Sequence, residues 1–328
     1  MLDGHGIETS ERRLKVLRAV HAGALPGTSL VVDEPAHGLV SDVLRGEDGH
    51  AHERALLGVV LETVPANDRW MQDRTFCPCA CLCERESRGA GCITRQHEGL
   101  PFEVVTTWRA VGRMETGPVA EPRVQVRDAH GGVQLWRRMR GQRDQATRDG
   151  DRELAILTTV PLRKASAKRI ARLYRQRWTR ETAFQHLEAS FHAAMHTWGS
   201  PKAALFGFCL ALVAYNMVAV VLAALRSVHG DTIDQALSLS SVANDIAQTY
   251  HGMMMAIPED AWRVFSPMRP AEMVTTLRTF AQKVRLDAYR KSPRGPKKPR
   301  PTCANTTKVP HVSTAKLLRE SKVNAATP

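Results

Sequence analysis

A tyrosine, an arginine and a glutamate recur at helical spacing between residues 171 and 196. The segment contains no Pro or Gly and is rich in helix-forming residues, so it predicts one long helix. On that helix Tyr174, Arg177, Glu181 and Glu188 share one polar stripe. An apolar face lies beside the stripe, formed by Leu173, Phe184, Leu187 and Phe191. Such a helix could present a carboxylate to a catalytic cleft, although an ion-paired surface helix gives the same pattern.

Other acids follow short apolar runs. Residues 69–72 predict a strand ending at Asp73, and residues 29–33 predict one ending at Asp33. Residues 11–18 are also expected to form a strand, and residues 49–64 a helix with Asp48 at its N-cap. Strands that end in acids around a helix indicate a mixed α/β sheet, which fixes side chains at its strand ends.

The spacing Tyr174-x2-Arg177-x3-Glu181 resembles the Y-x2-R-x3-E signature of the insertion-sequence-four family of transposases. The run from Asp73 to Cys77 is similar to the D-R-N-F-C that follows the family's second catalytic Asp, and Asp3-Gly4 with Glu11–Leu14 is similar to the segment around the first. Further matches follow in the family's order: Leu25–Gly27, Glu47–Ala51, Glu53-Arg54, Arg95–His97, Tyr215-Asn216, Lys291–Lys298 and His311–Thr314. The chain is identified as a member of this family.

The resemblance implies a DDE triad of Asp3, Asp73 and Glu181 that holds two Mg²⁺ ions, for which Mn²⁺ could substitute. Hard cations prefer oxygen ligands, and two such ions activate the attacking and leaving oxygens of a phosphodiester. The implied reaction is cleavage at the ends of a mobile element, followed by strand transfer to target DNA. Asp33 and Asp68 are rival acids, and the family pattern favours Asp3 over Asp33.

The same resemblance implies that Tyr174 and Arg177 contact the DNA backbone near the cleaved end. Trp178, Arg180 and Arg74 complete the expected DNA-binding set. Trp178 could stack on a base or simply pack. Glu188 departs from the pattern, because it stands where the family has a Lys.

Positive charge is concentrated in two regions of a chain whose formal net charge is +13. Residues 163–180 hold eight Lys or Arg and no acid, and residues 289–328 hold ten against Glu320 alone. A localised positive field indicates a polyanion partner. We therefore expect DNA as the partner, both terminal repeats and target, with possible self-association in a synaptic complex.

The expected fold is an RNase H-like α/β core over residues 1–91 and 163–230. Residues 92–162, with alternating apolar and polar runs, predict an antiparallel β insertion between the second Asp and the Glu181 helix. A helical region over 231–288 and a basic, Pro-rich, disordered tail over 289–328 follow, with at most a short helix near 314–322. The uncharged stretch Ala203–Leu225 is long enough to span a bilayer, but its Ala content, Gly207 and Asn216 favour a helix buried all round in a core, with no membrane.

Seven cysteines are an odd number, and no signal peptide is recognised, so we expect reduced thiols in a bacterial, cytoplasmic protein. Cys77, Cys79, Cys81 and Cys83 lack the C-x2-C spacing of zinc sites. His50, His52 and Glu53 could pass for ligands, but the solvated start of a helix is the favoured interpretation.

Asp3 has only two residues before it, whereas family members carry a sizeable segment there. This start predicts an N-terminally truncated protein whose sheet lacks most of its first strand, with Asp3 outside any hydrogen-bond ladder. The chain would then be catalytically silent or poorly soluble. The alternative function is therefore an inactive transposase remnant that binds nucleic acid only through its basic patches.

Overall fold

The computed structural model describes the chain except residues 8–13, 78, 98, 115–116, 128–130, 143–151, 178–198, 293–309 and 327–328. It divides into two compact units. The first comprises Met1–Gly6, Gly27–Asp33 and Ser41–Thr182. The second comprises Ile7–Pro26, Glu34–Val40 and Ala183–Pro328.

A mixed sheet forms the centre of the first unit. Five of its strands lie in the order β4-β3-β1-β5-β6, so the first strand of the chain is central. Their bounds are β1 Leu2–Ile7, β3 Gly27–Glu34, β4 Leu39–Gly46, β5 Arg69–Gln72 and β6 Gly91–Arg95. The pairs β1–β5 and β5–β6 are parallel. Four short helical segments connect the strands: η1 Glu53–Leu56, α2 Leu57–Glu62, η2 Arg74–Phe76 and α3 Cys79–Ser87.

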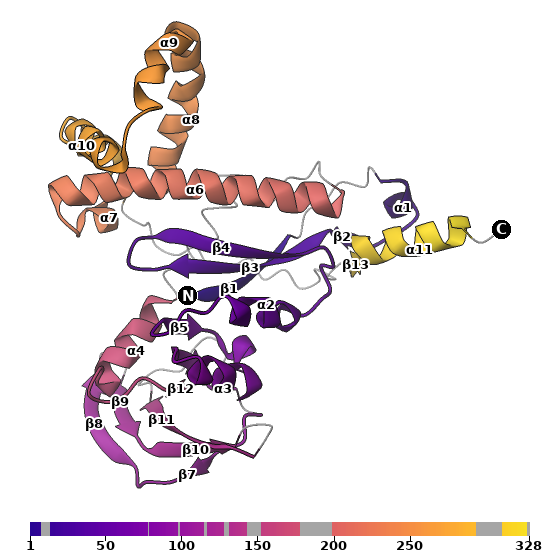
Figure 1. Cartoon of the computed structure of the whole chain (residues 1–328), viewed down its shortest axis with the longest axis vertical. Helices are drawn as coiled ribbons and strands as arrows, with labels where there is room; N and C mark the ends of the chain where they lie inside the picture. The colour runs from indigo at the N-terminus through magenta and orange to yellow at the C-terminus, as the bar shows by residue number, and fades with distance from the viewer. Residues whose placement is uncertain are drawn as a thin grey trace. The chain divides into compact units, whose positions relative to one another are not determined.

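The same sheet continues into an antiparallel part, because β12 pairs with β6. Figure 1 shows these strands curling around the lower part of the first unit. They are β7 Glu103–Val104, β8 Arg109–Met114, β9 Gly117–Glu121, β10 Arg123–Arg127, β11 Val133–Gln142 and β12 Glu153–Thr158. Helix α4, Ala167–Gln176, follows β12. The predicted β-rich stretch between Asp73 and the Tyr174 helix is therefore present.

Two apolar cores cover the two faces of this sheet. Cys92 and Leu157 pack with Trp136 in one core, whereas their neighbours Ile93 and Ile156 pack in the other, which includes Tyr174. Because successive strand residues point to opposite faces, α3 and α4 cover opposite sides. Helix α4 is thus fixed against the sheet by the burial of Tyr174.

The expectation that the sheet lacks its first strand is wrong. Met1 and Asp33 exchange backbone hydrogen bonds, and Leu2 is fully buried in a core with Leu30 and Trp70. Asp3 needs few residues before it to lie in a strand, because β1 continues after it as far as Ile7. Asp3 therefore lies within a hydrogen-bonded strand.

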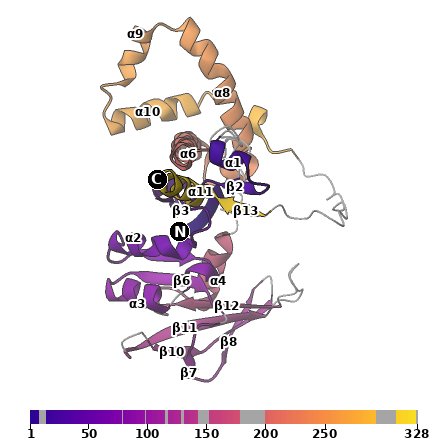
Figure 2. The same cartoon turned by 90° about the vertical axis from the view of Figure 1, so that its right-hand side faces the viewer.

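The second unit is mostly helical, with a small parallel sheet of β2, Gly23–Leu25, and β13, His311–Ser313. Figures 1 and 2 show α8 leading away from α6 to α9 at its far end. The helices are α1 Lys15–Arg18, α6 Pro201–His229, α7 Ile233–Ala236, α8 Leu239–Ala256, α9 Glu259–Trp262, η3 Arg263–Phe265, α10 Pro270–Ala281, η4 Leu286–Tyr289 and α11 Thr314–Ala326.

Helix α6 contains the uncharged stretch, and the prediction that it is buried all round is wrong. Phe208 and Leu212 are buried, but Phe206 and Met217 are 60% and 66% exposed. Asn216 fastens the helix by exchanging two 2.8 Å hydrogen bonds with the backbone of Val40. The helix is long and apolar enough to cross a membrane, but a helix from a globular core passes the same test, so this is weak evidence.

Other local predictions had mixed outcomes. The strand predicted at 123–127 has the predicted bounds, and the predicted strand at 69–72 is β5. Residues 15–18 form a helix and not a strand. In the predicted tail, the helix expected near 314–322 is present as the longer α11, and the strand β13 before it was not predicted.

Candidate active site

Asp3 and Asp73 lie at the same level of the sheet, on two neighbouring segments of chain. Leu2 of β1 is opposite Gln72 of the parallel strand β5; Asp3 is the next residue of β1, and Asp73 directly follows the end of β5. Neighbouring strands lie about 4.8 Å apart, so the two acids have adjacent backbones. Asp73 is further fixed by its side chain, which accepts a 2.6 Å hydrogen bond from the Arg74 amide at the start of η2.

Helix α4 brings a tyrosine and an arginine to these acids. Ser166 caps the helix by accepting a 3.3 Å hydrogen bond from the Arg169 amide. Tyr174 lies in the last turn of this helix and Arg177 is its C-cap, and both are at most 4% exposed. Arg177 Nη1 lies 3.8 Å from Asp3 Oδ2, and its guanidinium carbon is 5.9 Å from the centre of the Tyr174 ring.

Burial is the main reason why the pKa of Tyr174 is raised to about 12. The Arg177 charge opposes this increase, and the negative charge of Asp73 adds to it. At neutral pH the phenol is therefore uncharged and can donate a hydrogen bond. The structure thus brings together four of the predicted residues, Asp3, Asp73, Tyr174 and Arg177.

A third carboxylate, Glu53, also belongs to this cluster. A Cβ built on Gly4 would lie 1.9 Å from Glu53 Oε1, so the carboxylate occupies the space beside the residue that follows Asp3. The pKa of Glu53 is raised, first by burial and then by the charge of Asp73. Glu53 begins the helical segment η1, and His50 and His52 are exposed as expected, but Glu53 is half-buried and so not fully solvated. The one sequence signal that could have identified it is the family match at Glu53-Arg54.

Carboxylate oxygens at this position suit a hard divalent cation such as Mg²⁺ or Mn²⁺. Among the residues that the structure describes, no group of three or more His, Cys, Asp or Glu side chains is close enough to hold a metal ion. The predicted third ligand, Glu181, falls in residues 178–198, outside the described part of the chain. Trp178, Arg180 and Glu188 fall there too.

The rival acids lie elsewhere in the first unit. Asp33 is opposite Met1, and its carboxylate is 3.8 Å from the terminal amine. Asp68 precedes β5, at the end of that strand opposite Asp73. Arg74, expected to bind DNA, directly follows Asp73 and is exposed.

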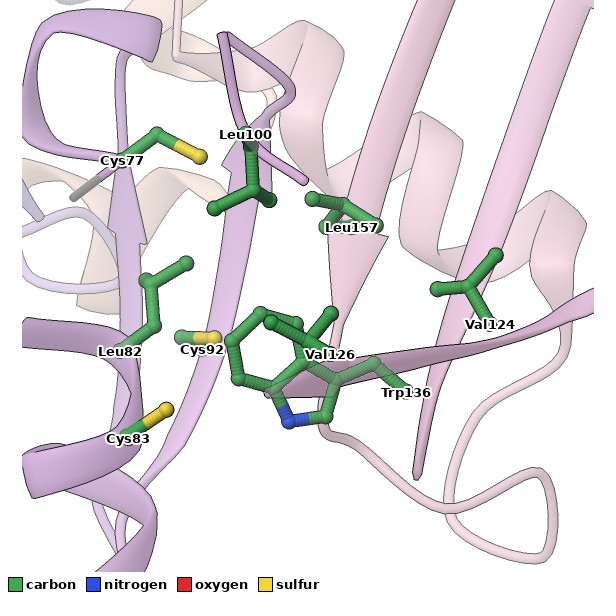
Figure 3. Packing of buried hydrophobic residues seen from close by; sticks show 9 residues of the cluster. All are labelled: Cys77, Leu82, Cys83, Cys92, Leu100, Val124, Val126, Trp136 and Leu157. Carbon is green, nitrogen blue, oxygen red and sulfur yellow. The ribbon is translucent and has the colours of Figure 1, made fainter. Parts of the chain in front are cut away.

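The cysteines that the structure describes here serve as packing residues. Cys77, Cys83 and Cys92 are buried in one apolar core with Leu82 and Trp136 (Figure 3). Burial raises the pKa of the Cys92 thiol to about 11. A thiol with such a pKa is protonated at neutral pH and is a poor nucleophile.

A family profile described as "Transposase DDE domain" matches residues 30–217. The chain belongs to the DDE transposase family. The match covers Asp73 and Glu181 and begins after Asp3. A search of curated proteins found no match. DDE transposases act on DNA and generally use divalent metal ions, so the family confirms the predicted transposase function in general, on a mixed α/β fold.

Proposed function

We propose that this chain is the catalytic region of a DDE transposase of the insertion-sequence-four type. It would cleave DNA at the ends of a mobile element in a Mg²⁺-dependent reaction and transfer the freed 3′ end to target DNA. The observation that carries the proposal is the register of β1 and β5, which places Asp3 beside Asp73. The order β4-β3-β1-β5-β6, with the first strand central, supports an RNase H-like core.

In this proposal Asp3, Asp73 and Glu181 hold two Mg²⁺ ions, or Mn²⁺ in their place. Bound metal ions would stabilise the negative charge on the attacking and leaving oxygens of the phosphodiester. Asp3 is preferred over Asp33 because Asp3 shares a level with Asp73, whereas Asp33 lies opposite Met1.

The chain's own residues would orient the DNA around these acids. Arg177 is held between Asp3 and the Tyr174 ring, so its planar guanidinium is already oriented for a phosphate. The neutral Tyr174 phenol can donate to the same strand. Arg74, Trp178 and Arg180 are proposed as further DNA contacts.

The remaining proposals follow from the family. The core would comprise residues 1–91 and 163–230, with the insertion at 92–162, a helical region at 231–288 and the basic segment at 289–328. Self-association in a synaptic complex and a bacterial cytoplasmic location accompany this function. The inactive remnant was favoured by a missing first strand, and β1 removes that argument.

The test uses the 328-residue chain and a supercoiled plasmid that carries its coding region with the flanking DNA. We expect nicking at the element boundaries with Mg²⁺ or Mn²⁺ and none with EDTA. Asp73→Asn should abolish nicking and retain DNA binding, whereas Asp68→Asn should cleave normally. Equal nicking by Asp73→Asn and the unchanged chain would refute the proposal.

A further inference from the structure

A basic pocket of about 600 Å³ lies in the first unit, beside the acids described above. Residues from η2, β6, β11 and the β12 region line it. The charged side chains that the argument uses are Arg74, Arg95, Arg138, Arg140, Arg152 and Glu153. We call this the arginine pocket.

Strand register explains why these side chains converge. Arg138, Arg140 and Gln142 alternate along β11 and therefore point to one face of the sheet. Across the ladder Arg140 is opposite Ala155, and Gln142 is opposite Glu153. Directly paired strand residues on one face lie about 4.5–5.5 Å apart. The side chains that β11 and β12 contribute to the pocket are thus positioned by the sheet.

The charges in the pocket are strongly unbalanced. Among the lining residues that the structure describes, five carry guanidinium groups and Glu153 is the one carboxylate. That carboxylate pairs with Arg140 Nη2 at 2.6 Å and with Arg138 Nη2 at 3.4 Å. A cluster of guanidinium groups attracts an anion with several oxygens.

Two of the guanidinium groups are held in place by aromatic rings. Arg138 lies 5.2 Å from the Phe102 ring centre and 5.3 Å from that of Trp108, and Arg140 lies 5.5 Å from Trp108. Arg138 Nε also donates a 2.6 Å hydrogen bond to Gln96 Oε1. Stacking restrains the side chains and reduces the entropy that they would lose on binding an anion.

The pocket also adjoins the candidate active site. Arg74 directly follows Asp73, and the charge of Arg95 influences Tyr174 electrostatically. Successive phosphates of one DNA strand are about 6–7 Å apart, and each accepts hydrogen bonds from guanidinium groups. If one phosphodiester of the DNA lies at Asp73, the next phosphates along the same DNA strand therefore reach the arginine pocket.

We propose that the arginine pocket binds backbone phosphates of the DNA strand beside the cleavage site. This inference rests on the proposed function, because that function supplies the DNA. The pocket would fix the position of the strand without reading its sequence, since phosphates carry no base information.

The test measures binding of the full chain to a fluorescent DNA duplex by anisotropy, in EDTA and over a range of KCl concentrations. Each lost phosphate contact lowers the slope of log K against log salt by about 0.9. The double variant Arg140→Gln/Arg152→Gln should therefore reduce the slope by about 1–2. The control Arg127→Gln changes an exposed arginine of the same sheet outside the pocket and should leave the slope within about 0.3 of the unchanged chain.

A second variant is expected to change the DNA affinity in the opposite direction. Glu153→Gln removes the shared carboxylate from two arginines, so DNA should bind several-fold more tightly. Thermal melting of each variant confirms that it is folded. Equal slopes for the pocket variant and Arg127→Gln, or unchanged affinity for Glu153→Gln, would overturn the inference.

The experiment separates this inference from the proposed function because it contains no metal and measures no cleavage. Binding that depends on the pocket, together with a failed plasmid test, would leave the inference standing and refute the transposase activity. A polyglutamate competitor of equal charge should displace DNA poorly. Displacement as effective as that by unlabelled DNA would show an acidic-peptide site and overturn the proposal.

Discussion

Arg177 Nη1 lies 3.8 Å from Asp3 Oδ2, although the two residues come from opposite ends of the first unit's sequence. The arginine is 4% exposed and the aspartate side chain is 17% exposed, so the pair is only partly screened by water. A cation at this position compensates an acid that has Asp73 on the neighbouring strand. The pair therefore ties the end of helix α4 to β1 beside the candidate catalytic acids.

The third ligand is tested with Glu181→Gln. The change removes a charge and conserves shape, so nicking of the plasmid should fall by at least about 10³-fold while DNA affinity persists, since a metal-ligand change acts on the chemical step. Glu188→Gln is the matched control on the same predicted stripe and should nick normally. Loss of nicking in the control alone would transfer the ligand assignment to Glu188.

Tyr174 predicts a dependence of stability on alkaline pH. Its pKa is about 12 in the folded chain and about 10 when unfolded, so the folded state holds the proton more tightly. The resulting stability is fully present below pH 10 and is lost as the pH rises towards 12, with a total of about 2–3 kcal/mol.

The measurement is urea unfolding of the unchanged chain and of Tyr174→Phe between pH 9 and pH 11. As the pH rises, the free energy of unfolding of the unchanged chain should fall relative to that of Tyr174→Phe. A constant difference would show that Tyr174 titrates normally. Tyr250→Phe, on an exposed tyrosine, is the control and should show no such trend.

Gly4→Ala should act on Glu53 without changing any charge. The new Cβ would lie 1.9 Å from Glu53 Oε1, so the carboxylate must move away. If Glu53 supports the metal-binding acids, Gly4→Ala and Glu53→Gln should both raise the Mg²⁺ concentration needed for half-maximal thermal stabilisation, by about 10-fold, the lower end of the range for groups around a metal site.

The double variant Gly4→Ala/Glu53→Gln decides whether the two changes both act through the Glu53 carboxylate. Its effect should equal that of either single variant, because residues in contact are not additive. Gly58→Ala serves as control, since nothing lies within 4 Å of a Cβ built there. Additive effects in the double variant would contradict a shared route through Glu53.

The basic tail should contribute to DNA affinity, but deleting residues 290–328 is a poor test because it also removes β13 and α11. Lys297→Gln/Lys298→Gln/Arg300→Gln changes charge alone and should reduce the salt slope by up to about 2–3. Lys316→Gln/Lys322→Gln on α11 is the comparison. An unchanged slope in the triple variant would exclude a phosphate-binding role for those three residues.

Several parts of the fold were predictable because they depend on local pattern. Residues 123–127 alternate strictly, and Asp73 ends an apolar run, so β10 and the end of β5 could be placed from sequence. The strand β1 was missed because the expectation counted residues before Asp3, whereas the strand runs on to Ile7 and has β3 and β5 as its neighbours. Sequence alone does not show which distant strands will pair.

Site residues followed the same rule. Tyr174 and Arg177 were predicted from their spacing along one helix and Asp73 from the end of an apolar run, and the structure brings the three residues together. The partial burial of Glu53 was missed because it depends on Gly4, a residue without a side chain, in a distant segment of the chain. Helix α6 was misjudged because an uncharged sequence does not reveal which face has a neighbour.

The parallel pairing of β2 with β13 has a consequence for synthesis. The small sheet cannot form until His311, the partner of Gly23, has been synthesised 288 positions later in the chain. At about 5–20 residues per second, that interval on a ribosome is on the order of 15–60 s. The strands of the first unit are complete much earlier, by Thr158. The second unit therefore cannot finish folding until His311 has been synthesised, well after the strands of the candidate catalytic sheet.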